Sequence, residues 1–554
     1  MVTNLETFLP RLQNTAFFLF LIIILGISIR FFYFPFEVPI VTDGYFSFIY
    51  SASTVFSGEL PIGYTVGNTG WANFLSLIFS FMEKTDPMYL MDVQRTSSIF
   101  LSTLTIIPAY FIFKKFTNYK LAIFGCLLLA IEPRLLLISL EGINYSLFLF
   151  LFVTSLALFL KKTNFSLIAC FVCISFAVLV RYEAIFLIVP FSIMYFRKFG
   201  NKNGILRYFA IIFTIVIILI PIGMMRIEAT QNICYQHFIL GETCGKDGII
   251  SEIIGNISFF TKYIIFDERL DEYVKDDETY RIHFETYDDS SESAFSKSIL
   301  VGSSKLATFF GLILLPYFLF FIVANIITRI KNRESLKWNF DSTTVFLCTI
   351  VMLLPAMYGF MRDINEIRYV LIFIPLVCII SISFRSSVVE KISQDKRILI
   401  MLIIFTIILS IGFIEFEKRD YIYDRESFKI SKEIVSYTDK TNAFDNAGYI
   451  KTAILFNEWP DLPKPNVNGK IDHLFEKVST KNFADIQEFI IFAKKSNLEY
   501  FVVDEKEVLF EELRVKIEKY PYLEKIFDSD YHDYENRFLI FKIDYEEFDK
   551  ILNE

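Results

Sequence analysis

The first candidate catalytic residue is an acid that follows a long apolar segment. Asp43 is the first charged residue of the stretch VPIVTDGYFSFIYSASTVFSGELP, residues 38–61. A carboxylate in a partly dehydrated place can accept the proton of a hydroxyl or amine as that group attacks the anomeric carbon of a sugar. Asp is also a good N-cap for a helix that begins at Gly44. The two roles are compatible, so Asp43 is a candidate general base at the start of a helix.

Other ionisable residues gather at the same ends of the apolar segments as Asp43. They are Asp92, Arg95, Glu132, Arg134, Glu141, Arg181, Glu183, Arg362, Asp363, Glu366 and Arg368. A single Arg here can simply snorkel to lipid headgroups, but charges near hydrocarbon are costly and a cluster of them indicates a functional site. Guanidinium groups match phosphate oxygens and stay charged near lipid, which predicts a cleft for a lipid phosphate. Its candidate contacts are Arg95, Arg134, Arg181 and Arg368.

The composition is typical of an integral membrane protein. Of 554 residues, 54% are hydrophobic and 17% aromatic, which is too apolar for a soluble chain of this length. Apolar runs long enough for about 30 Å of hydrocarbon predict about eleven spans. These are 12–33, 95–113, 121–140, 145–160, 164–180, 183–196, 206–226, 299–328, 343–361, 368–384 and 397–414. A net charge of −8 argues against a nucleic-acid partner, because phosphate backbones recruit basic surfaces.

The distribution of Lys and Arg predicts the orientation. The basic connections are FKKFTNYK (113–120), KKTN (161–164), RKFGNKNGILR (197–207), TRIKNRESLKW (328–338) and FRSSVVEKISQDKR (384–397). Basic loops face the cytoplasm, so the N-terminus is expected on the cytoplasmic side of the cell membrane and the C-terminal part on the outer side. The apolar segment 71–82 is too short to span, and we expect it to be an interfacial helix with Trp71 at headgroup level.

The predicted fold class is mainly α, a polytopic helical membrane bundle with a small C-terminal extracytoplasmic α/β domain. The membrane domain covers 1–414, including a first outer loop at 34–94 and a long outer loop at 227–298. The extracytoplasmic domain covers 415–554. Within it, alternating residues predict strands at 449–456, 498–504 and 537–544 and an amphipathic helix at 482–497.

The cysteines divide between the spans and an outer loop. Cys126, Cys170, Cys173, Cys348 and Cys378 fall in predicted spans, where Cys is usually a small core residue. Cys234 and Cys244 fall in the loop QNICYQHFILGETCGKDG, where oxidising conditions permit a disulfide. We predict that these two cysteines form a bridge.

The order and spacing of these segments resemble the polytopic GT-C glycosyltransferases. The likeness is to the branch of dolichyl-phosphate-mannose protein mannosyltransferases and the aminoarabinose transferase of lipid A. The matching stretches are TDGYFSFIYSASTVFSGELP, GNTGWANFLSLIFSFM, VQRTSSIFLSTLTIIPAYFIFKKF, AIEPRLLLISLEGINYSLFLFL, LVRYEAIFLIVP and IRYVLIFIPL. They cover nearly the whole membrane region, and each motif alone is degenerate.

The resemblance implies roles for several of these residues. Asp43 falls where the family carries the acid of its first outer loop, which acts as general base or orients the acceptor with a divalent cation. Arg181 and Arg368 fall where relatives contact the donor phosphate. The chain departs from many relatives by having Gly44 in place of a second acid. A Mg²⁺ or Mn²⁺ site would therefore need Asp43 together with Glu132 or Glu141.

The sequence thus predicts an inverting transferase on the outer membrane face. It would move a sugar from a polyprenyl-phosphate donor to a protein, lipid or glycan acceptor, with Asp43 as base. An oligosaccharyltransferase is a related alternative, but the C-terminal part contains no Trp-Trp-Asp-Tyr-Gly-like stretch. A transporter or flippase of a charged polyprenyl-linked lipid is an alternative from another class; such proteins tend to carry broken helices with polar groups near the bilayer midplane. A non-catalytic membrane anchor would not need the arginine cluster.

Overall fold

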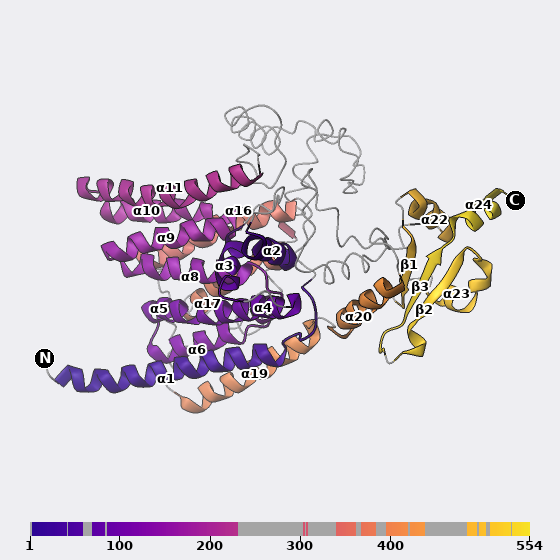
Figure 1. The fold of residues 1–554 in the computed structure, drawn as a ribbon. Helices are drawn as coiled ribbons and strands as arrows, with labels where there is room; N and C mark the ends of the chain where they lie inside the picture. Colours follow the sequence, from indigo (N-terminus) through magenta and orange to yellow (C-terminus); the bar gives the residue numbers. More distant parts are fainter. Residues whose placement is uncertain are drawn as a thin grey trace. The chain divides into compact units, whose positions relative to one another are not determined.

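A computed structural model gives the fold (Figure 1). Apart from isolated positions, it describes residues 3–40, 43–58, 69–82, 86–230, 303–307, 339–361, 367–383, 395–418, 421–437, 483–495, 498–505 and 510–553. The described part is mostly helical with one small sheet near the C-terminus, which confirms the mainly α class. Predictions for the loop 227–298, most of the span 299–328, the strand 449–456 and the Cys234–Cys244 bridge lie outside the described residues.

The chain divides into two compact units. The first comprises residues 1–33, 65–71 and 97–416, and the second comprises residues 34–64, 72–96 and 417–554. The predicted division at residue 415 into a membrane and an extracytoplasmic domain stays a prediction.

Long helices make up the first unit. They are α1 (Thr3–Phe32), the second half of α4 (Pro87–Leu104), α5 (Ile106–Phe116), α6 (Tyr119–Ala130), α7 (Pro133–Leu140), α8 (Tyr145–Lys161), α9 (Asn164–Val180), α10 (Ile188–Phe199), α11 (Lys202–Thr230), α16 (Phe340–Met361), α17 (Phe373–Ser383) and α19 (Lys396–Glu417). Two short 3-10 helices, η2 (Tyr182–Leu187) and η4 (Ile367–Val370), join α9 to α10 and precede α17. Helix α9 packs between α8 and α11, and α6 packs against α1, α5 and α17 (Figure 1).

Several helices are long and apolar enough to cross a membrane. Among the described residues the candidate spans begin at Thr15, Pro87, Lys202, Phe340 and Ile400, and α6 with α7 makes a sixth if this bent pair counts as one span. Most described helices overlap the predicted spans, and α9 begins and ends where its span was predicted, but the predicted span 121–140 is broken into α6 and α7. The chain is therefore a membrane protein, but the predicted number of about eleven spans is not confirmed.

A break separates α6 from α7 because the sequence AIEPRLLL cannot continue one helix. Pro133 is the first residue of α7, where its missing N–H costs nothing, and Glu132 caps the helix by accepting a hydrogen bond from the Leu135 N–H at 2.7 Å. The two helices meet at 45°. The break places Glu132 and Arg134 inside the first unit rather than at its surface.

The segment predicted as an interfacial helix is α3 (Gly70–Phe79), but its tryptophan does not face lipid. Trp71 is fully buried, and its indole N–H donates to the Gly142 carbonyl at 2.9 Å. Trp71 is therefore a buried packing residue, and the prediction that it lies at headgroup level stays a prediction. A buried indole needs an acceptor, and the turn after α7 provides one.

The second unit contains α2 (Asp43–Ala52) and the C-terminal sheet. The sheet is antiparallel, with the strand order β1 (Tyr500–Asp504), β3 (Phe538–Ile543), β2 (Leu523–Asp528). One face packs on α22 (Ile486–Lys495), α23 (Phe510–Val515) and α24 (Tyr545–Asn553), and the other face packs on α20 (Tyr421–Tyr437). Strands β1 and β3 and helix α22 were predicted, whereas β2 was not.

Candidate functional site

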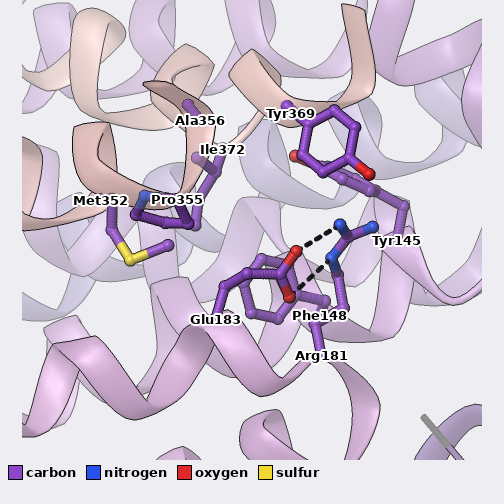
Figure 2. A pocket seen from close by; sticks show the side chains of 9 residues that line it. All are labelled: Tyr145, Phe148, Arg181, Glu183, Met352, Pro355, Ala356, Tyr369 and Ile372. Atoms are coloured by element: carbon purple, nitrogen blue, oxygen red, sulfur yellow. Dashed lines mark hydrogen bonds and ion pairs between the residues drawn. The ribbon is translucent and has the colours of Figure 1, made fainter. Parts of the chain in front are cut away.

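A recess in the first unit brings a charged pair, two tyrosines and an apolar wall together. It is a small recess, open on one side, among α8, η2, α16 and the segment from η4 to α17. Its lining residues are Tyr145, Phe148, Arg181, Glu183, Met352, Pro355, Ala356, Tyr369 and Ile372 (Figure 2). Arg181, a predicted site arginine, borders this recess, so we treat it as the candidate site.

Arg181 enters the recess because α9 ends there. Its backbone is extended, with φ −149° and ψ 119°, and the 3-10 helix η2 begins at the next residue. The Arg181 Nη2 lies 2.6 Å from Glu183 Oε1, and its Nε lies 3.4 Å from Glu183 Oε2. The two side chains are 12% and 8% exposed, so this is a forked ion pair held largely away from water (Figure 2).

Three aromatic rings surround the Arg181 guanidinium. Its central carbon lies 5.3 Å from the centre of the Tyr145 ring, 5.9 Å from that of Phe148 and 5.6 Å from that of Tyr369. Burial alone would lower the pKa of Arg181, but the charge and hydrogen bond of Glu183 more than offset it and raise the pKa above the ordinary value. The rings and the carboxylate therefore hold a permanent cation beside the recess.

The opposite side of the recess is apolar. Met352, Pro355 and Ala356 come from α16, and Ile372 precedes α17 (Figure 2). A guanidinium has five N–H donors and Glu183 takes two of them, so Arg181 can donate to a further acceptor. The recess thus suits an amphiphile with an anionic group on one side and hydrocarbon on the other.

Arg368 is the second predicted arginine that comes to this place. It belongs to η4, directly before the recess residue Tyr369. It lies close enough to Tyr145 to interact with it electrostatically, as does Arg181. Two of the four predicted phosphate contacts are therefore gathered around Tyr145.

Arg134 and Glu132 lie at the α6–α7 break and not in the recess lining. The Arg134 guanidinium carbon lies 4.5 Å from the centre of the Phe413 ring of α19. Glu132 is fully buried and caps α7. Their burial among helices indicates a structural contribution, and their predicted roles in phosphate or metal binding stay predictions.

Arg30, which sequence reasoning missed, is the most completely hydrogen-bonded arginine at the break. It is 1% exposed, and it donates to the carbonyls of Gly26 and Ala130 at 3.0 and 2.9 Å and to the hydroxyls of Ser139 and Ser102, both at 3.1 Å. It ties α1 to the helices around the break. An arginine inside the predicted span 12–33 was the signal that could have identified it.

In the second unit, Arg95 forms hydrogen bonds to the backbone that precedes Asp43. Its guanidinium donates to the Val38 carbonyl at 2.6 Å and to the Pro39 carbonyl at 3.2 Å. The neighbouring Gln94 donates to the Gly44 carbonyl at 2.8 Å, and Asp43 is the first residue of α2, as predicted. Arg95 and Gln94 therefore fix the chain on both sides of Asp43.

The described residues do not assemble a metal site. No three His, Cys, Asp or Glu residues of this part of the chain come together with ligand geometry. Of the metal candidates, Glu132 is engaged as a helix cap and Glu141 is an exposed residue at the end of α7. The side chain of Asp43, the third candidate, lies outside the described part, so a divalent cation stays a prediction, and the proposed transfer step does not use one.

The cysteines of the helices are free and mostly buried. Cys126, Cys170, Cys348 and Cys378 are buried and Cys173 is half-buried. This confirms that they are small residues packed within the helices, including the CxxC pair of α9.

Comparisons with known proteins find only distant structural likeness. No protein-family model matches the chain, and no curated protein matches its sequence. The apo oligosaccharyltransferase of Archaeoglobus fulgidus is 13% identical with a TM-score of 0.47, over 88% of this chain and 69% of that one. Its complex with Zn and sulfate is 13% identical with a TM-score of 0.48, over 94% of this chain and 72% of that one. The same organism's oligosaccharyltransferase AglB, in complex with an inhibitory peptide and a dolichol-phosphate, is 13% identical with a TM-score of 0.48, over 88% of this chain and 69% of that one. At this distance the likeness does not assign the chain to a family.

Proposed function

We propose that the protein is a membrane glycosyltransferase that takes its sugar from a polyprenyl-phosphate donor. The observation that carries this proposal is the recess, in which a buried guanidinium faces an apolar wall. Both halves match the donor, whose phosphate joins a sugar to a hydrocarbon chain. The acceptor is a protein, lipid or glycan group on the outer side of the membrane.

In this proposal the recess binds the phosphate and the first part of the lipid. The remaining N–H donors of Arg181 take phosphate oxygens, and Arg368 supplies a second positive charge. The wall formed by Met352, Pro355 and Ile372 contacts the adjoining hydrocarbon. The Glu183 pair and the surrounding rings hold the guanidinium in place before the donor arrives, which reduces the cost of ordering it.

The transfer is a single displacement at the anomeric carbon. The acceptor oxygen or nitrogen forms a bond to that carbon as the bond to the phosphate oxygen breaks, and the acceptor proton moves to the Asp43 carboxylate. The electron pair leaves on the polyprenyl phosphate, where Arg181 and Arg368 stabilise the developing charge. One in-line displacement inverts the anomeric centre, by analogy with glycosidases. Arg95 and Gln94 serve as positioning residues because they fix the backbone around Asp43.

The α6–α7 break favours one other candidate, a carrier of a charged polyprenyl lipid. Broken helices with buried charges are typical of transporter binding sites, and Arg30 and Glu132 lie at this break. However, Arg30 bonds to protein carbonyls and hydroxyls, and Ser410 donates to the Ile131 carbonyl. The Ala130 and Ile131 carbonyls at the break are thus satisfied by the protein's own groups, which favours the transferase over the carrier.

The experiment that tests this function is release of polyprenyl phosphate by purified protein. Wild type is incubated with a panel of polyprenyl-phosphate sugars and candidate acceptors, and compared with Asp43→Asn. Asn is close to Asp in size and is equally suited to a helix start, so this change removes the base with little effect on α2. Loss of a general base lowers the rate by about 100- to 10,000-fold.

A matched control is Asp86→Asn in the same unit. Asp86 accepts a hydrogen bond from the Met88 N–H at 3.2 Å at the start of α4, so Asn can replace it without loss. Release by wild type and Asp86→Asn, but not by Asp43→Asn, is the expected result. Equal release by all three would reject Asp43 as the base. Lipid movement across proteoliposomes without any release would favour the carrier.

A further inference from the structure

A concentration of positive charge lies at the end of α8 away from the recess. Helix α8 has 17 residues, so its two ends are separated by about 25 Å. At the far end, Lys162 directly after α8 and Lys198 of α10 lie against Phe340 and Asp341, the first residues of α16, and Lys115 of α5 lies near Lys198. These five residues are called the lysine cluster below.

The contacts within the lysine cluster are specific. Lys162 forms an ion pair with Asp341, and its Nζ lies 4.6 Å from the centre of the Phe340 ring. The Lys198 Nζ lies 5.3 Å from the centre of the same ring. The Lys115 Nζ donates to the Leu160 carbonyl at 2.5 Å, in the last turn of α8. Two lysines are therefore held around one aromatic ring, and a third lies near them at the end of α8.

The charges of the lysine cluster do not balance. The Lys198 ammonium interacts with those of Lys162 and Lys115 and with the Asp341 carboxylate, which is already paired with Lys162. Burial lowers the pKa of Lys198, and the nearby charges of Lys162 and Lys115 lower it further against the opposing effect of Asp341. Like charges held this close repel one another, and an added anion would relieve that repulsion.

The backbone at Lys162 also indicates a role for its side chain. Lys162 ends α8 with φ +66°, in the left-handed region where helix ends usually carry glycine. A lysine there costs about 1–2 kcal/mol relative to glycine. Glycine would suit this backbone better but has no ammonium group, which indicates that the charge of Lys162 has a role.

We propose that the lysine cluster binds the phosphate group of an anionic lipid headgroup. Ammonium groups bind phosphate as point charges, and basic pockets between membrane helices bind such headgroups. In this arrangement the phosphate lies among Lys162, Lys198 and Lys115 and competes with Asp341 for Lys162. The site is independent of sugar transfer and lies at the other end of α8.

A general band of basic residues at a membrane surface would make a different prediction. Such a band attracts anionic lipid through every Lys and Arg alike. Lys114 is exposed and adjoins Lys115, but its Nζ lies beside the Tyr110 ring at 5.8 Å from its centre and not in the cluster. Lys114 therefore separates a defined site from a diffuse field.

The test measures lipid retained by the full chain in detergent, using native mass spectrometry. The probes are phosphatidylglycerol and phosphatidylcholine with the same acyl chains. Wild type is expected to retain phosphatidylglycerol preferentially, and Lys198→Gln to weaken this by about fivefold. Lys162→Gly removes an ammonium while suiting the left-handed backbone, so it should weaken retention similarly without unfolding the chain. Asp341→Asn should strengthen retention, because it removes the internal competitor.

Lys114→Gln is the matched control and should change retention by less than about twofold. An effect of Lys114→Gln as large as that of Lys198→Gln would overturn the proposal. Equal retention of the two lipids by wild type, or no gain in Asp341→Asn, would overturn it as well. A further arm adds glycerol 3-phosphate: displacement of the lipid supports a phosphate site that soluble phosphates can also fill, and no displacement supports one reserved for lipid.

Discussion

Two buried arginines of the first unit differ in what their donors contact. Arg30 gives its hydrogen bonds to the carbonyls of Gly26 and Ala130 and to two serine hydroxyls. Arg181 is paired with Glu183, lies among aromatic rings and borders a recess. Burial alone does not separate these residues, because both are held largely away from water.

The comparison teaches that the surroundings of a buried charge indicate its role. Arg30 joins segments that are far apart in sequence, and its donors satisfy carbonyls left open by the α6–α7 break. It therefore stabilises the bundle. Arg181 is held by one carboxylate and keeps donors for another acceptor at the edge of open space. It therefore suits ligand binding, and the predictions below test this division.

The largest expected effect is the loss of Arg30. Arg30→Ala leaves buried carbonyls and the nearby Glu132 without their cation, at a cost of about 3–5 kcal/mol in the free energy of unfolding. Arg30→Lys keeps the positive charge but loses the forked N–H donors of the guanidinium, so the free energy of unfolding should fall by less. Unfolding in detergent by denaturant titration measures both. If the unfolding midpoint of Arg30→Ala equals that of wild type, Arg30 does not stabilise the bundle as described.

A smaller and reversible effect is expected at the recess. Arg181→Gln alone leaves the Glu183 carboxylate buried without its partner and should cost about 3 kcal/mol. Adding Glu183→Gln removes that charge, so the double variant should lie within about 1 kcal/mol of wild type. The same denaturant titration gives the coupling between the two residues. Additive losses would show that the pair does not act as a unit.

The close approach of α3 to the end of α9 predicts an effect at Gly70. A Cβ on Gly70 would lie 2.5 Å from the Leu179 carbonyl carbon and 2.6 Å from the Val180 nitrogen, directly before Arg181. Gly70→Ala should therefore cost about 1–3 kcal/mol and displace the backbone that carries Arg181. Gly412→Ala is the control, since no atom lies within 4 Å of its added Cβ. Equal midpoints for the two variants would contradict this packing.

The smallest expected effect is at Trp71. Trp71→Phe keeps the buried aromatic ring but removes the N–H that bonds to the Gly142 carbonyl. The expected loss is about 1 kcal/mol in the free energy of unfolding, measured by the same titration. An unchanged stability would show that this bond contributes nothing beyond the packing of the ring.

Sequence reasoning predicted the features that depend on local pattern. The helix 164–180 is bounded by a capping box at Thr163 and Ser166 and by extended Arg181, and all of these are local. The placement of Asp43 at a helix start is local as well. Strand β2, with the sequence LEKIFD, was missed because its charged residues and its bulge weaken the alternation.

The features that sequence reasoning missed depend on long-range contacts. The partners of Arg30 are separated from it by up to 109 positions, so no local pattern reveals that its donors are satisfied within the bundle. Arg95 bonds to carbonyls 57 and 56 positions earlier, which the sequence does not reveal, and its predicted phosphate contact stays a prediction. Trp71 was placed at the lipid surface because its acceptor, 71 positions later, could not be seen in the sequence.

The most direct test of the central claim is polyprenyl-phosphate release by Arg181→Gln/Glu183→Gln. This double variant keeps the charge balance of the recess and removes the guanidinium. If the recess binds the donor phosphate, release should fall by about 100-fold or more while the unfolding midpoint stays close to that of wild type. Release at the wild-type rate by the folded double variant would contradict the assignment of this recess to the donor.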